Sequence, residues 1–151
     1  MIFIPVSIGE LIDKYTILEL KKIYCKSKYQ TQNIQNELDL LKKKLESINI
    51  DNLDVLYTKL YTTNHKLWTI EDDIRKLENN EQYNDDYIIC AHCVIVFNDL
   101  RSKIKKEINT NYNSEIHEEK VYDNYNSELR DKSLKNKFRL YLEKLSNISY
   151  I

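Results

Sequence analysis

The sequence predicts an all-α protein, an antiparallel bundle of four main helices followed by a short fifth helix and a C-terminal helix. Its 151 residues include one glycine and one proline, whereas sandwiches, barrels and parallel α/β sheets need many turn glycines. Apolar residues recur at the three- and four-residue spacing of an amphipathic helix along most of the chain. No internal repeat or domain boundary is visible, so we expect a single helical domain over residues 1–151.

The first helix is expected to begin after Ser7. Ser7 and Glu10 form the S-x-x-E pattern of a capping box, in which each residue satisfies a backbone N–H that the helix leaves free. Val6 and Leu11 occupy the positions of a hydrophobic staple around this start. An apolar face then continues to about Tyr24, where the helix is expected to end.

The second and third helices carry longer apolar stripes. The segment "SKYQ" at 27–30 repeats the capping box and opens a helix whose stripe occupies 34–48. The third helix is expected to start near Asp51, with apolar residues alternating by three and four through 53–77. This long heptad pattern is typical of an antiparallel bundle or a coiled coil.

The fourth helix is expected over 85–108. Its first half is apolar nearly all round, which predicts burial between neighbouring helices or in a homodimer. Ser114 can cap a short fifth helix, because Glu115 and Glu118 would lie at its positive end. A last amphipathic helix is expected around 134–145.

Composition narrows the classes of function. The net charge is −1, so no strong field attracts nucleic acid or an anionic membrane surface. The start lacks the basic region and cleavage site of a signal peptide, and the apolar run 88–97 is too short to span a bilayer. We expect a cytoplasmic protein with free thiols that binds neither nucleic acid nor membrane. The abundance of Asn, Ile, Lys and Tyr is typical of an AT-rich genome, such as that of many large viruses.

Polar residues border the apolar stripe of the third helix. Asn64, Trp68, Glu71, Arg75 and Glu78 follow one another at spacings of four and three, directly beside the core positions. Glu71 and Arg75 can form an ordinary ion pair one turn apart on a solvated helix. The alternative is a half-buried carboxylate cluster that holds a divalent cation or acts as an acid or base.

Two further positions suggest a site. Asp13 lies beside the core face of the first helix, and Asp99 follows the apolar run of the fourth. With Glu71 they would form a possible Mg²⁺ site. The segment "CAHC" at 90–93 offers two ligands of the four that zinc needs, but within an apolar run free cysteines behave as small hydrophobes. A zinc site is therefore not favoured.

Four ordered segments, "IPVSIGELIDKYTILELK", "LWTIEDDIRKLE", "FNDLRSKIKKEIN" and "EEKVYDNY", resemble the motifs of an uncharacterised domain-of-unknown-function family of small, mostly bacterial helical proteins. The resemblance covers 5–125 and leaves 126–151 as a C-terminal helical extension. It implies no activity. The polar motif positions, which form the candidate cluster, are Glu10, Asp13, Lys14, Trp68, Glu71, Asp72, Arg75, Asn98, Asp99, Arg101, Glu118, Glu119, Lys120 and Tyr122, with Glu19, Lys21 and Lys106 as further matches.

Two functions remain open from the sequence. The favoured one is a non-enzymatic interaction or assembly module, in which charged residues fix the alignment of the helices and the heptad helices bind a protein partner. The alternative is a polar pocket between the first, third and fourth helices. It would bind a small anionic or phosphorylated ligand, such as a nucleotide or nucleotide sugar, and it could house a Mg²⁺-dependent enzyme.

Overall fold

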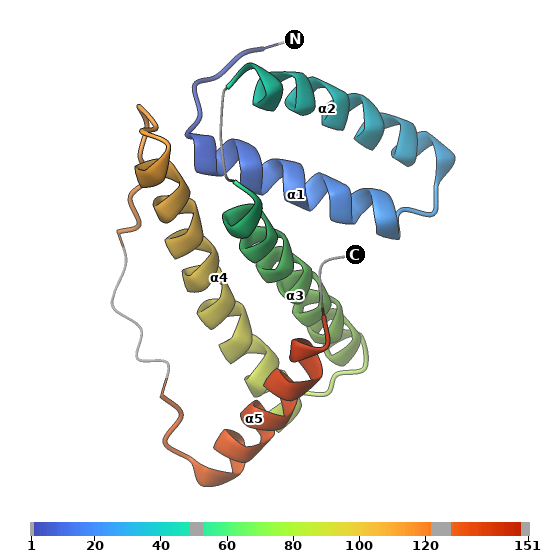
Figure 1. Cartoon of the computed structure of the whole chain (residues 1–151). Helices are drawn as coiled ribbons and strands as arrows, with labels where there is room; N and C mark the ends of the chain where they lie inside the picture. Colours follow the sequence, from blue (N-terminus) through green and yellow to red (C-terminus); the bar gives the residue numbers. More distant parts are fainter. Residues whose placement is uncertain (1, 49–52, 122–127, 149–151) are drawn as a thin grey trace.

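The computed structural model describes residues 2–48, 53–121 and 128–148, and its secondary structure there is entirely helical (Figure 1). The helices are α1 (Ile8–Tyr24), α2 (Lys28–Ser47), α3 (Asp54–Asn79), α4 (Asp85–Asn111) and α5 (Lys132–Ser146). The predicted all-α class is therefore confirmed. Each described helix is too short or too polar to cross a bilayer.

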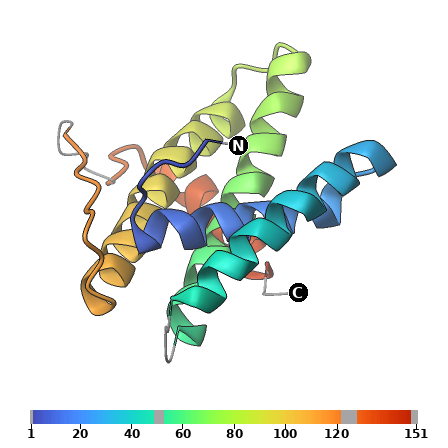
Figure 2. The same cartoon turned by 90° about the horizontal axis from the view of Figure 1, so that it is seen from above.

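Two antiparallel helix pairs cross one another (Figures 1 and 2). α1 and α2 form one pair, α3 and α4 form the other, and α1 lies across one end of the α3–α4 pair. α5 packs against α4 near the other end. α1 therefore contacts every other main helix of the bundle, which places its polar face next to both α3 and α4.

The apolar core is divided into two clusters. One lies where α3, α4 and α5 meet and includes Leu67, Phe97 and Leu145. The other lies where α1 meets α3 and α4 and includes Leu60 and Ile104. The side chains of Asn64 on α3 and Arg101 on α4 lie between these clusters along the two helices, and both belong to the site described below.

The predicted helix caps are present. The Ser7 hydroxyl accepts a hydrogen bond from the backbone N–H of Glu10 (3.1 Å), and Ser27 accepts from Gln30 (3.5 Å). The Glu10 carboxylate binds a lysine of α4, so it does not act as a simple capping group. Val6 remains exposed, which does not fit the expected staple.

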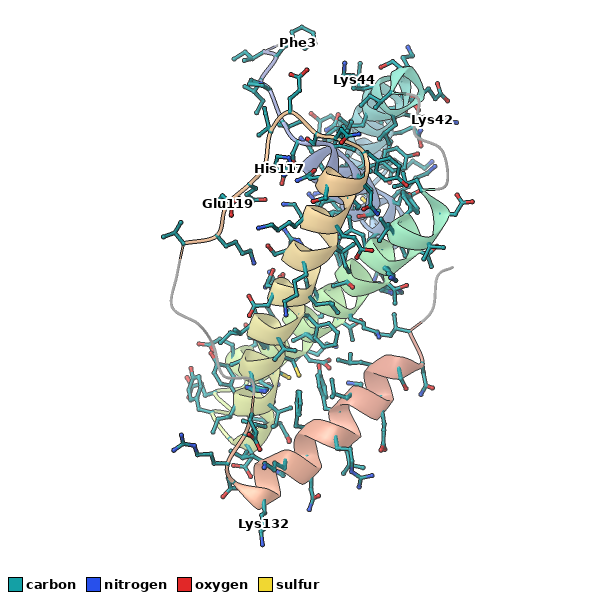
Figure 3. The ribbon with its side chains drawn as sticks, turned by 60° about the vertical axis from the view of Figure 1, so that its left-hand side comes forward. Phe3, Lys42, Lys44, His117, Glu119 and Lys132 are labelled. Carbon is teal, nitrogen blue, oxygen red and sulfur yellow. The ribbon has the colours of Figure 1, made fainter. Side chains whose placement is uncertain are left out.

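The predicted short fifth helix is wrong. Residues 115–121 form an extended segment without helical structure. The Ser114 hydroxyl does not cap a helix there; it accepts a hydrogen bond from the N–H of Ile8 (3.2 Å) and donates to the carbonyl of Ile116 (2.9 Å). We call residues 114–121 the strap, and Figure 3 shows it beside α4 with His117 and Glu119 upon it.

Helix boundaries also differ in detail. α4 continues to Asn111, beyond the expected end at 108. The expected start of the third helix, Asp51, lies outside the described residues, and α3 is described from Asp54. α5 covers part of the all-round apolar surface of α4, where the rings of His92 and Phe138 pack edge to face.

Candidate functional site

The Asp13 carboxylate is the centre of a polar network that joins three helices. Its side chain is 2% exposed. One oxygen accepts a hydrogen bond from the Asn64 amide of α3 (2.8 Å), and the other lies 3.2 Å from the Arg101 guanidinium of α4. The Asn64 amide also donates to the Thr16 hydroxyl (2.9 Å). A buried carboxylate is tolerated only with such partners.

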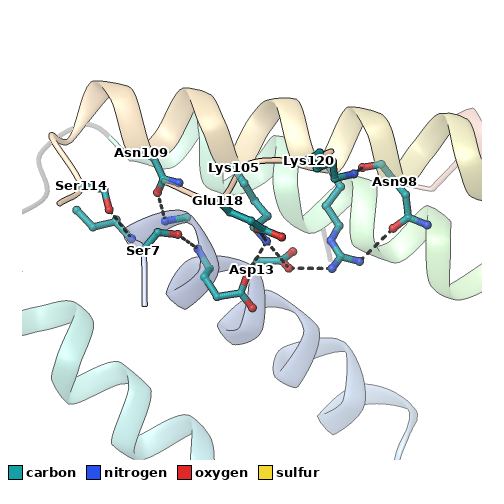
Figure 4. A network of polar contacts seen from close by, with 12 residues as sticks. Ser7, Asp13, Asn98, Lys105, Asn109, Ser114, Glu118 and Lys120 are labelled. Atoms are coloured by element: carbon teal, nitrogen blue, oxygen red, sulfur yellow. Dashed lines mark hydrogen bonds and ion pairs between the residues drawn. The ribbon is translucent and has the colours of Figure 1, made fainter. Parts of the chain in front are cut away.

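Lys105 is the second centre of the network (Figure 4). Its side chain is 8% exposed, and its ammonium group donates to Glu10 (2.5 Å) and to Glu118 of the strap (2.6 Å). The Asp13 carboxylate lies 4.0 Å away. Lys105 therefore ties α4 to α1 and to the strap at a single atom.

The titration of these groups follows from their surroundings. Burial raises the pKa of Asp13 above its ordinary value, although Asn64, Arg101 and Lys105 favour the ionised form. Burial alone would lower the pKa of Lys105, but the hydrogen bonds to Glu10 and Glu118 raise it instead. The hydrogen bond from Lys105 lowers the pKa of Glu118. The Lys105–Glu118 pair therefore supports the fold at neutral pH and weakens as acid protonates Glu118.

Side chains from α4 and the strap bind the first turn of α1. The N–H of Gly9 donates to the Asn109 amide oxygen (2.7 Å), and the N–H of Ile8 donates to Ser114. A Cβ at Gly9 would lie 2.7 Å from the Lys105 carbonyl oxygen. The chain's one glycine is thus required by the close approach of α1 and α4.

Polar pairs hold the strap along α4. Lys120 lies 3.8 Å from Asp99 and donates to the Asn98 carbonyl oxygen (3.2 Å). Glu119 lies 3.7 Å from Lys106 on the surface. Together with the Glu118–Lys105 contact, these pairs attach the second half of the strap to α4.

The structure brings together one part of the predicted cluster, namely Glu10, Asp13, Asn98, Asp99, Arg101, Glu118 and Lys120. Arg101 links the two sides, because it contacts Asp13 and also donates to the Asn98 amide oxygen (3.4 Å).

The remaining predicted residues lie elsewhere. Glu71 and Arg75 form an exposed pair 3.5 Å apart, with side chains 51% and 67% exposed, and Asp72 is exposed beside them. Lys14 pairs with Glu37 of α2 (2.7 Å), and Trp68 stacks on Tyr24. Glu119 joins the surface pair described above, and Tyr122 lies outside the described residues.

The expected Mg²⁺ site does not form from its three carboxylates. Asp13, Glu71 and Asp99 contact three different cations, Arg101, Arg75 and Lys120. Among the described residues, no group of three or more His, Cys, Asp and Glu side chains could hold a metal ion. The expectation failed because Glu71 lies on a part of α3 where its neighbours leave it in solvent.

Cys90 and Cys93 belong to the apolar core. Both side chains are buried in the cluster formed by α3, α4 and α5. Burial raises the pKa of both thiols, that of Cys93 to about 12. Thiols in this environment remain protonated at neutral pH and behave as small apolar side chains.

Sequence reasoning missed Lys105 and the two asparagines, Asn64 and Asn109, that complete the network. The family-like motif was matched to Lys106, which is exposed. A usable signal existed, because Lys105 follows Arg101 by four residues and therefore shares its helix face. Asn64 borders the apolar stripe of α3, and its spacing alone does not indicate a buried carboxylate as its partner.

A cavity of about 320 Å³ opens beside the network. Asp13 and Arg101 contribute to it from α1 and α4, and Glu37 contributes from α2. Lys14 and Lys21 of α1 add two further positive charges, and Glu10 of α1 adds a further negative charge. This cavity lies between α1, α2 and α4, whereas the sequence predicted a pocket between the first, third and fourth helices.

Comparison with known proteins gives a family but no activity. No curated protein and no solved structure matches the chain. The sequence profile of a family of unknown function, DUF6165, matches residues 2–137. This span includes α1 to α4, the strap and the first turns of α5. The chain, with its Asp13 and Lys105 network, belongs to this family of unknown function.

Proposed function

We propose that the protein is a non-enzymatic helical interaction module whose charged network holds the helices in one alignment. The observation that carries this proposal is that the buried charges of the network have partners of their own. Asp13 is held by Asn64 and Arg101, and Lys105 by Glu10 and Glu118. Charged groups engaged in this way stabilise a fixed arrangement of helices, which suits a rigid scaffold for a partner.

The N-terminal segment supplies a surface for that partner. Ile2, Phe3 and Ile4 are 91%, 86% and 72% exposed, and they precede the buried Ser7 that caps α1. Consecutive exposed apolar side chains mark interaction sites more often than isolated ones do. The partner that we propose is a second copy of the chain, because closed two-fold dimers are the commonest assemblies.

Replacing Phe3 and Ile4 together by serine should abolish self-association without affecting the fold. Burying one such side chain contributes about 1.5–3 kcal/mol, and a two-fold dimer contains each replaced side chain twice. Each replacement should therefore raise the dissociation constant roughly 10²- to 10⁴-fold. Sedimentation velocity over the micromolar range measures this. The matched control is Val121→Ser, which removes another highly exposed apolar side chain and should leave association unchanged.

The proposal fails if the wild-type chain sediments as a monomer at every concentration, or if the double variant associates as strongly as wild type. Circular dichroism of both variants checks that the helices are intact.

A second candidate function is the binding of a small anionic ligand in the cavity beside Asp13. Its volume of about 320 Å³ lies in the range of ligand sites. Lys14 is held by Glu37, and both side chains are substantially exposed. A phosphate group could therefore replace Glu37 and also contact Lys21 and Arg101.

Inorganic phosphate, pyrophosphate and nucleotides should then raise the melting temperature of wild type, because a ligand that binds only the folded state stabilises it. Lys14→Gln combined with Lys21→Gln should remove this effect. Lys42→Gln, a surface lysine paired with Glu46, is the control and should retain it. Melting curves that no anion shifts at millimolar concentration would reject the ligand site while leaving the assembly proposal untouched.

A further inference from the structure

The strap lies on α4 with little help from apolar burial. Its residues 115–121 are all exposed, including Ile116 and Val121. The buried member is Ser114, which is fixed by hydrogen bonds to Ile8 and Ile116. The hydrophobic effect therefore contributes little to the position of 115–121, and charged contacts determine it.

The strap runs antiparallel to α4 overall (Figure 3), and its charged residues contact residues of opposite charge on that helix. Glu118 contacts Lys105, Glu119 contacts Lys106, and Lys120 contacts Asp99 near the middle of the helix. Two acidic residues and one basic residue of the strap thus contact two basic residues and one acidic residue of α4. Such complementarity specifies orientation as well as charge.

We propose that this face of α4 is a docking surface for an extended acidic peptide, and that the strap occupies it in cis. The surface consists of Asp99, Lys105 and Lys106, together with the Asn98 carbonyl oxygen that accepts from Lys120. The partner is a protein segment with two consecutive acidic residues followed by a basic one. This inference is independent of the self-association proposed above, which uses the N-terminal segment.

Lys105 is the anchor of the surface. Its ammonium group is the one nearly removed from solvent, whereas the Glu119–Lys106 pair is exposed. Exposed pairs contribute little to binding and partly buried ones more. Glu118 therefore provides the main attachment, and a partner needs a carboxylate at the same place.

The surroundings of Lys105 favour a carboxylate over a phosphate group. Glu10 and Asp13 already lie 2.5 and 4.0 Å from its ammonium nitrogen. A dianion arriving beside them would meet two like charges, whereas a single carboxylate replaces Glu118 without changing the local charge. The proposed partner is consequently an unmodified acidic peptide.

Occupation in cis makes the strap an internal competitor. A tethered segment has an effective concentration in the millimolar range for short linkers, so a free peptide binds well only when the strap is weakened. The strap is in this sense autoinhibitory.

The test uses a fluorescent peptide with the sequence of residues 114–121, SEIHEEKV. It is titrated by anisotropy against wild type and against the full-length Glu118→Gln/Glu119→Gln variant. Saturable binding is expected for the variant, with binding to wild type at least roughly tenfold weaker. A peptide with glutamine at the positions of Glu118 and Glu119 should not bind, and added salt should weaken the complex.

The control variant is Glu115→Gln, which removes one strap charge without changing either lysine pair and should behave as wild type does. The strap side chains are exposed, so the variants should fold, and circular dichroism verifies this. Equal binding by wild type and variant would overturn occupation in cis. Failure of the variant to bind at millimolar peptide, or equal binding of the glutamine peptide, would overturn the docking surface itself.

Discussion

Arg101→Met should lower the free energy of unfolding by about 3–5 kcal/mol at neutral pH, because it leaves a buried carboxylate without its nearest cation. Asp13 would keep its hydrogen bond from Asn64, but the Lys105 nitrogen is 4.0 Å away and is already shared with two glutamates. Urea unfolding of wild type and variant measures the difference.

Arg75→Met is the matched control, because it breaks an ion pair whose side chains are both mainly exposed. Its expected cost is roughly 0–1 kcal/mol. If the two variants lost equal stability, the Asp13 network would be no more important to the fold than a surface pair.

The stability deficit of Arg101→Met, which is its loss of unfolding free energy relative to wild type, should change with pH in a defined direction. Burial raises the pKa of Asp13, and loss of Arg101 should raise it further. The folded variant then binds a proton more tightly than the unfolded chain does, so its stability falls as pH rises. The deficit should be greatest above the folded pKa of Asp13 and should shrink as acid protonates the carboxylate. A deficit that is constant with pH would contradict this account.

Gly9→Ala should destabilise the protein, although alanine is the better helix former by about 1 kcal/mol. The new methyl group would lie 2.7 Å from the Lys105 carbonyl oxygen and 2.9 Å from the Asn109 amide oxygen. The first of these is helical backbone and cannot rotate away, so α1 and α4 must separate.

Overpacking of this kind costs about 1–3 kcal/mol, which for a chain of this size lowers the melting temperature by several degrees, at about 2–4 °C per kcal/mol. Thermal unfolding followed by circular dichroism measures the shift. Asn33→Ala on the exposed surface of α2 is the control, and it should leave the melting temperature unchanged or slightly higher. A higher melting temperature for Gly9→Ala would show that the helices can move apart freely.

The helices were predictable because their signals are local. The caps at Ser7 and Ser27 and the spacing of apolar residues depend on neighbours within one or two turns. The strap was mispredicted because the same local rule applied to Ser114, whose hydroxyl is bound by Ile8, 106 residues earlier in the chain. A capping residue with a distant partner cannot be recognised from its own neighbourhood.

The candidate site shows the same limit. Asp13 and Glu71 both border an apolar stripe, and sequence spacing treats them alike. α1 packs across one end of the α3–α4 pair, so Asp13 is enclosed while Glu71 remains in solvent. Whether a residue beside an apolar stripe is buried depends on where another helix crosses. Neighbouring residues in the sequence do not carry that information. The expected homodimer remains a prediction for sedimentation to decide.

The division of the core has a consequence for how the molecule opens. Apolar contacts transmit cooperativity between neighbouring side chains, but the two clusters are separated along α3 and α4 by the layer of Asn64 and Arg101. We therefore expect the end that α5 closes to open more readily than the end that α1 closes, as a separate unit of unfolding. Transient opening at that end would bring Cys90 and Cys93 into contact with solvent while α1 and the strap stay in place.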